Sequence, residues 1–248
     1  ISDDTNRGSV EGVNAMMPLV AILVVFGSFM SLNQDLPETW TVIFGVIGTV
    51  VLALGVAGFF LIEDNTVKTE ENSHYFANIF YGFRPSVIKK SPMLYVYLIL
   101  FTVFGISIQI FMPYLIIYYE KSLGMPDYVF IMAPAIILAS VATALWGKVY
   151  DKKGFDFSGF IAIASLMLGY VLLYFFKGTA LVFVGSLFMM CGYLCGMAVF
   201  GAKIRDLTPD GKAGMLQGVR ICAQVLVPGV IGPKIGSRVL RNAELVPN

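Results

Sequence analysis

Long apolar stretches without charged residues dominate the chain. Seven can be marked in its 248 residues, and the first six contain no Asp, Glu, Lys or Arg. An α-helix needs about 20 apolar residues to cross a bilayer, whereas the strands of a membrane barrel alternate over about 10 residues. The sequence therefore predicts an all-α fold, a polytopic membrane helix bundle of about seven transmembrane helices. The expected spans are Val13–Leu32, Trp40–Ile62, Met93–Tyr118, Tyr128–Trp146, Phe157–Phe176, Thr179–Ala202 and Met215–Ile235.

Composition and motifs argue against several other classes. Charged residues make up 13% of the chain, against about 25% in soluble domains. The net charge of +1 gives no field for nucleic acid. Cys191, Cys195 and Cys222 lie inside apolar stretches and do not resemble a disulfide framework or metal site. Since His74 is the only histidine and no phosphate-binding loop occurs, we expect neither enzyme activity nor a cofactor.

Basic residues predict the orientation. If the spans alternate, one side of the membrane receives eleven Lys and Arg residues and the other side receives four. The positive-inside rule makes the richer side cytoplasmic, so the chain starts inside the cell membrane and its C-terminal end lies outside. The first residues, 1–8, read like an internal loop that leads into a helix. We therefore expect this chain to be a fragment of a larger bundle.

The longest connection, residues 63–92, separates two spans from five. Apolar residues at positions 76, 79, 80 and 83 follow helical spacing, which predicts a short amphipathic helix at the cytoplasmic interface. The connection is either a hinge between two halves or a solvated linker. We expect residues 1–62 to end an N-terminal half and residues 93–248 to form most of a C-terminal half.

A short pattern occurs twice, 203 residues apart. Asp3-x-Thr5-x-x-Gly8 precedes the first span, and Asp206-x-Thr208-x-x-Gly211 precedes the seventh. Both copies fall on the expected cytoplasmic side. The offset fits a repeat of six helices, which is a known arrangement in transporters.

The loop after the fourth span carries the most specific motif. Its residues Gly147, Asp151, Lys152, Lys153 and Gly154 resemble the G-x-x-x-D-[RK]-x-G loop of the major facilitator superfamily, whose members are twelve-helix transporters. Glycine allows close helix approach and tight turns. The carboxylate can accept hydrogen bonds from the N–H groups at a helix end. Because such contacts can form in one conformation and break in another, we expect this loop to act in gating.

A closer resemblance covers most of the chain. Residues 81–85, the Asp151 loop, and the stretch from Arg205 through Pro233 resemble the glycoside–pentoside–hexuronide:cation symporters. This resemblance implies a secondary active transporter that works by alternating access and carries a sugar or glycoside together with H⁺ or Na⁺. It also implies that the seven spans are the fifth to eleventh helices. The cation-binding carboxylates of that branch lie in earlier helices, so no coupling site is expected in this chain.

Polar side chains inside the spans are candidates for the substrate cavity, because uncompensated polarity is costly in a bilayer. Gln109 can both donate and accept hydrogen bonds, or it can bond to a neighbouring helix. Arg220 can line the cavity or extend to lipid headgroups. The candidates are Gln109, Tyr114, Tyr193, Arg220 and Gln224.

Two other functions stay open. An exporter of amphipathic compounds on the same fold would need a wide apolar cavity. A seven-helix receptor fits the number of spans, but it would have its N-terminus outside.

Overall fold

A computed structural model describes residues 7–29, 32, 36–61, 80–125, 127–209 and 211–243. Helices account for nearly all of these residues and none of them forms a strand, which confirms the all-α prediction. Five helices are long and apolar enough to cross a membrane, and they contain six of the expected spans. The first expected span lies in α1 (Arg7–Phe29) up to Phe29, and α1 includes six residues before the apolar stretch.

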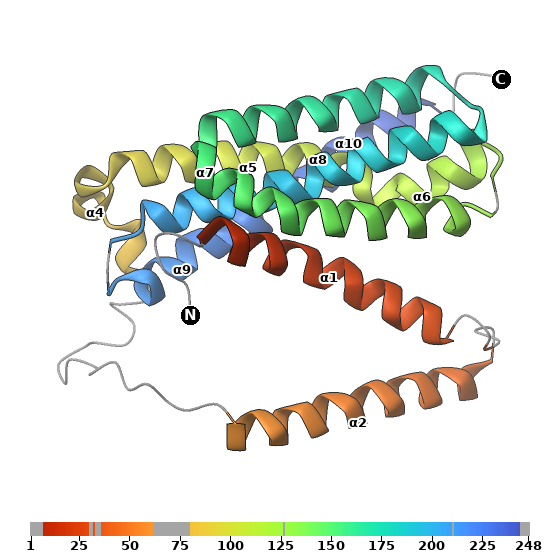
Figure 1. Ribbon diagram of the computed structural model, residues 1–248, viewed down its shortest axis with the longest axis horizontal. Helices are drawn as coiled ribbons and strands as arrows, with labels where there is room; N and C mark the ends of the chain where they lie inside the picture. The colour runs from red at the N-terminus through yellow and green to blue at the C-terminus, as the bar shows by residue number, and fades with distance from the viewer. Residues whose placement is uncertain are drawn as a thin grey trace. The chain divides into compact units, whose positions relative to one another are not determined.

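Two expected spans are joined in one helical element, α7 (Val129–Phe175). The chain reverses inside it at Gly154, so the two limbs run in opposite directions in Figure 1. Gly154 has φ 73° and ψ −173°, a conformation that essentially only glycine adopts. The expected loop at residues 147–156 is therefore largely helical, with one sharp reversal. The Trp146 indole N–H donates to the Ser158 carbonyl across this reversal, at 3.3 Å.

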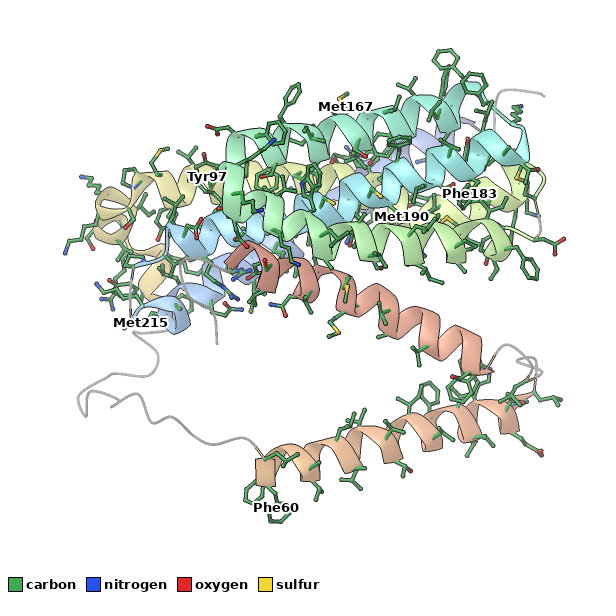
Figure 2. All side chains as sticks on the ribbon, viewed as in Figure 1. Phe60, Tyr97, Met167, Phe183, Met190 and Met215 are labelled. Atoms are coloured by element: carbon green, nitrogen blue, oxygen red, sulfur yellow. The ribbon has the colours of Figure 1, made fainter. Side chains whose placement is uncertain are left out.

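The bundle is built around α8 (Thr179–Asp206). This helix packs along α7, and α10 (Val227–Ala243) packs along α5 (Pro92–Phe111). Proline at the first turn of α5 suits a helix start, because its missing N–H would lack a helical partner anyway. Aromatic rings join α5, α7 and α8 at the end of the bundle where Figure 2 labels Tyr97: Phe155 contacts both Tyr97 and Phe200.

Two of the expected spans are less regular than the sequence suggests. After α5 come a 3₁₀ turn (Met112–Tyr114), the short α6 (Leu115–Ile117) and a π-helical turn (Tyr118–Ser122). Pro113, which lacks an N–H donor, lies in the first of these. The last span consists of α9 (Ala213–Ile221), a π-helical turn (Cys222–Leu226) and α10.

The described part of the long connection is folded against the bundle. It contains a 3₁₀ turn (Tyr81–Phe83) and α4 (Pro85–Lys90). The Tyr95 hydroxyl donates to the Gly82 carbonyl, and Gly82 packs against Leu216 and Val219 of α9. The first part of the expected amphipathic helix, with positions 76 and 79, lies outside the described residues, and positions 80 and 83 belong to the 3₁₀ turn or directly precede it.

The chain divides into two compact units. One comprises Ile1–Val20 and Tyr75–Asn248, and the other comprises Ala21–His74. The second unit contains α2 (Pro37–Leu61), a helix whose only buried residue is Ile43. Its side chains, Phe60 among them, project from the helix on all sides (Figure 2). A helix that is apolar all round is typical of a membrane span.

Candidate functional site

The Asp151 carboxylate accepts three hydrogen bonds from the start of α1. Its Oδ1 receives the Gly8 N–H at 2.7 Å. Its Oδ2 receives the Ser9 N–H at 3.1 Å and the Ser9 hydroxyl at 2.7 Å. The first N–H groups of a helix have no partner within the helix and carry a partial positive charge. A residue of α7 thus caps α1 across more than 140 positions of sequence.

Glycines allow this cap to form. A Cβ atom at Gly147 would overlap the Gly8 carbonyl and approach Ser9, and one at Gly8 would lie 2.7 Å from the Asp151 Oδ1. The backbones of α1 and α7 come this close because both positions are glycine. The first glycine of the motif therefore acts together with its aspartate.

The two motif loops found in the sequence are joined directly. The Tyr150 hydroxyl donates to an Asp206 carboxylate oxygen, so the end of α8 is tied to the residue before Asp151. Thr208 donates from its hydroxyl to the Ile204 carbonyl at 2.7 Å. Gly211 has φ 71° and turns the chain into α9. The second motif therefore ends α8 and starts α9.

The two basic residues of the motif lie on the exposed side of the reversal. The Lys153 ammonium group is 4.1 Å from the centre of the Phe157 ring, a cation–π contact. Lys152 is exposed. Neither lysine contributes to the cap of α1.

Sequence reasoning missed Glu11, the most buried charged residue in the described part of the chain at 6% exposure. Its Oε1 lies 2.7 Å from the Arg205 guanidinium of α8 and 3.4 Å from that of Arg220 in α9. Gly201 leaves room for the carboxylate, since a Cβ there would lie 3.0 Å from its Oε2. One carboxylate on α1 therefore bridges two arginines from other helices.

Polar side chains surround this bridge and line a cavity of about 320 Å³. Arg220 and Gln224, two of the candidates from the sequence, both line it. The π-helical turn Cys222–Leu226 contains Gln224, and such turns are frequent at functional sites. The lining residues are Glu11, Asn14, Ala15, Met197, Arg205, Gln217, Arg220 and Gln224.

The other candidates lie elsewhere in the bundle. Gln109 packs with its Cβ against Gly232 of α10. Tyr114 donates to the Pro233 carbonyl at 3.3 Å and lines a separate, mostly apolar cavity of about 450 Å³. Tyr193 is partly buried in α8 and is not among the lining residues of either cavity. The structure thus groups Arg220 with Gln224 and leaves these three outside that group.

A second cavity shares residues with the polar one. It has about 400 Å³, and Arg205, Gln217 and Arg220 line both. Its other walls are mostly apolar and include Leu94 and Leu98 of α5. Within the described ranges no three His, Cys, Asp or Glu residues are grouped so that they could hold a metal ion. Ion pairs and hydrogen bonds connect the helices at this site.

Apolar helices with buried ion pairs and a polar cavity between them define a multi-pass membrane protein with a transport-type architecture. The family model of the Major Facilitator Superfamily matches residues 3–233. The chain belongs to the Major Facilitator Superfamily, whose members carry small-molecule solutes across lipid bilayers. None of the curated proteins and none of the solved structures matches the chain.

Proposed function

We propose that the protein is a secondary active transporter that works by alternating access, and that two contacts at the start of α1 hold its cytoplasmic side closed. The first contact is the cap that Asp151 places on Gly8 and Ser9. The second is the bridge from Glu11 to Arg205 and Arg220. Both connect α1, from the expected N-terminal half, to helices of the expected C-terminal half.

The observation that carries this proposal is the position of the charges. Buried ion pairs contribute little net stability compared with apolar packing, yet three charged side chains meet between α1, α8 and α9. Contacts of this kind form or break as a unit when helices separate. They therefore suit a gate with two states.

The transported solute is proposed to be hydrophilic, a sugar or glycoside moved together with H⁺ or Na⁺ across the cell membrane. The resemblance of the motif loops to sugar:cation symporters supports this substrate class. The cavity at the bridge adds support, since Asn14, Gln217 and Gln224 supply side-chain amides that can bond hydroxyl groups. An exporter of amphipathic compounds would instead favour the apolar cavity beside Tyr114.

A cysteine-labelling experiment tests the gate. The reporter is Met197→Cys, at a partly buried position in the cavity wall, in a full-length protein whose native cysteines are replaced. Asp151→Asn loses charge-assisted hydrogen bonds and turns an amide N–H₂ toward N–H donors, so the closed state weakens. Because such bonds are worth about 1.5–3 kcal/mol, labelling from the cytoplasmic side should accelerate about 10-fold.

The matched control is Asp156→Asn, five residues along the same reversal. Asp156 is exposed, so its variant should label like the parent protein. Equal labelling and equal transport in Asp151→Asn and Asp156→Asn would show that the cap is not a gate.

A further inference from the structure

The positive charge at the bridge exceeds the negative charge. Among the described residues that line the cavity at the bridge, Glu11 is the one acidic side chain and Arg205 and Arg220 are the two basic ones. Because one carboxylate serves two guanidinium groups, one unit of positive charge is left without a partner in that lining.

The neighbouring cavity of about 400 Å³ has a larger excess of positive charge in its lining. Arg205 and Arg220 line it too, and none of its described lining residues is acidic. Thr208 and Gln217 add polar groups beside the guanidiniums, and Leu94, Leu98 and Leu216 form apolar walls. A guanidinium in such low-dielectric surroundings favours an anionic partner.

The two arginines are not held equally by Glu11. The distance to the carboxylate is 2.7 Å for Arg205 and 3.4 Å for Arg220, whose side chain is 20% exposed. A guanidinium has five N–H donors in a fixed fork. Arg220 thus keeps donor capacity at the place where both cavities meet.

We propose that Arg205 and Arg220 form the binding site for an organic anion, and that the solute of this transporter carries a carboxylate. The inference rests on the transporter function proposed above and concerns the charge of the solute, which that proposal leaves open. The carboxylate would take its hydrogen bonds chiefly from Arg220, with the body of the solute beside Gln217 or along Leu94 and Leu98.

Binding of such an anion would act on the gate. The arriving carboxylate competes with Glu11 for the same guanidinium groups, so the bridge from α1 to α8 and α9 weakens when the site is filled. The three side chains carry a net charge of +1, and together with the carboxylate of the solute the total becomes zero. Solute binding and opening of the cytoplasmic side are thereby coupled through one set of ion pairs.

Matched pairs of probes test the charge preference. Gluconate is compared with sorbitol, and benzoate with benzyl alcohol; each pair has a similar body and differs in its carboxylate. Binding is measured by calorimetry on the full-length protein in nanodiscs of zwitterionic lipid, so that no anionic headgroup competes. Charge-assisted hydrogen bonds predict that at least one anion binds about 10-fold or more tightly than its neutral partner.

Variants identify the site. Arg220→Gln should abolish the preference for the anion, and Arg220→Lys, which keeps the charge without the fork, should retain part of it. Arg241→Gln, at an exposed arginine of α10, should behave like the parent protein. Retention of the parent protein's heat stability shows that a variant is folded.

Equal binding of both members in both pairs would overturn the inference, as would an anion preference that survives Arg220→Gln. Neither result would contradict the gate proposal, because the labelling of Asp151→Asn is measured without solute. Conversely, if the protein prefers the anions but Asp151→Asn does not change the labelling rate, the anion site is supported and the gate proposal is wrong.

Discussion

At the scale of single residues, a substitution of Glu11 is expected to lower the stability of the protein. Glu11→Gln keeps the shape of the side chain and removes its charge, which leaves two guanidinium groups without a carboxylate. We expect a loss of about 1–3 kcal/mol in the free energy of unfolding, since groups in a buried charged pair are costly to leave unpaired. Thermal unfolding in detergent measures this, with the exposed Glu120→Gln as control.

An equal stability of Glu11→Gln and Glu120→Gln would mean that the bridge contributes nothing to the closed conformation. The gate would then depend on the Asp151 cap alone. A greater stability of Glu11→Gln would indicate that the parent protein maintains an unfavourable charge at this place for its function, as functional sites often do.

The difference between Asp151 and Glu11 shows what the sequence can predict about such a site. Asp151 lies in a motif whose spacing points to its chemistry, and its hydrogen bonds to a helix end follow from that chemistry. Glu11 precedes the apolar stretch by two residues, so it is easily taken for part of a loop. Its partners, Arg205 and Arg220, are about 200 positions away, and nothing local connects them.

At the scale of elements, the reversal inside α7 depends on one backbone conformation. Gly154→Ala places a Cβ where φ is 73°, and nothing lies within 4 Å to clash with it, so the cost is conformational alone. Strained positions of this kind cost about 1–3 kcal/mol. We therefore expect a lower melting temperature. The control is Gly178→Ala, where φ is −72° and the space is also open.

If Gly154→Ala and Gly178→Ala have the same melting temperature, the reversal tolerates a side chain at position 154 and another residue sets its geometry. A loss confined to Gly154→Ala would assign the second glycine of the motif a structural role. That role would be distinct from close packing, which belongs to Gly147.

Helix positions are largely predictable here, because the length of an apolar stretch is a direct physical requirement of a bilayer. Apart from end residues such as Leu32, Tyr128 and Phe176, the described residues of the expected spans therefore lie in helices. Helix ends are less predictable: near the described start of α1, Asp151 accepts the Gly8 and Ser9 N–H groups, and this partner comes from another element. The π-helical turn at Cys222–Leu226 likewise depends on packing that no local pattern encodes.

At the scale of the whole molecule, the cap and the bridge should act on one equilibrium, because both lie within the first two turns of α1. If each contact contributes about 1–2 kcal/mol to the closed state, each single variant shifts the equilibrium about 5- to 30-fold. For contacts that do not interact directly, free energies add and these factors multiply. Asp151→Asn combined with Glu11→Gln should therefore open the protein far more than either change alone.

Spin labels on both sides of this contact report the populations. Met17 of α1 and Met167 of α7 are both exposed, at 54% and 62%, and cysteines there accept labels without disturbing the core. Pulsed electron resonance should give one main distance in the parent protein and a second, growing population through the single variants to the double variant. A double variant no more open than Asp151→Asn alone would place Glu11 outside the gate, and its bridge would then serve only to position Arg220.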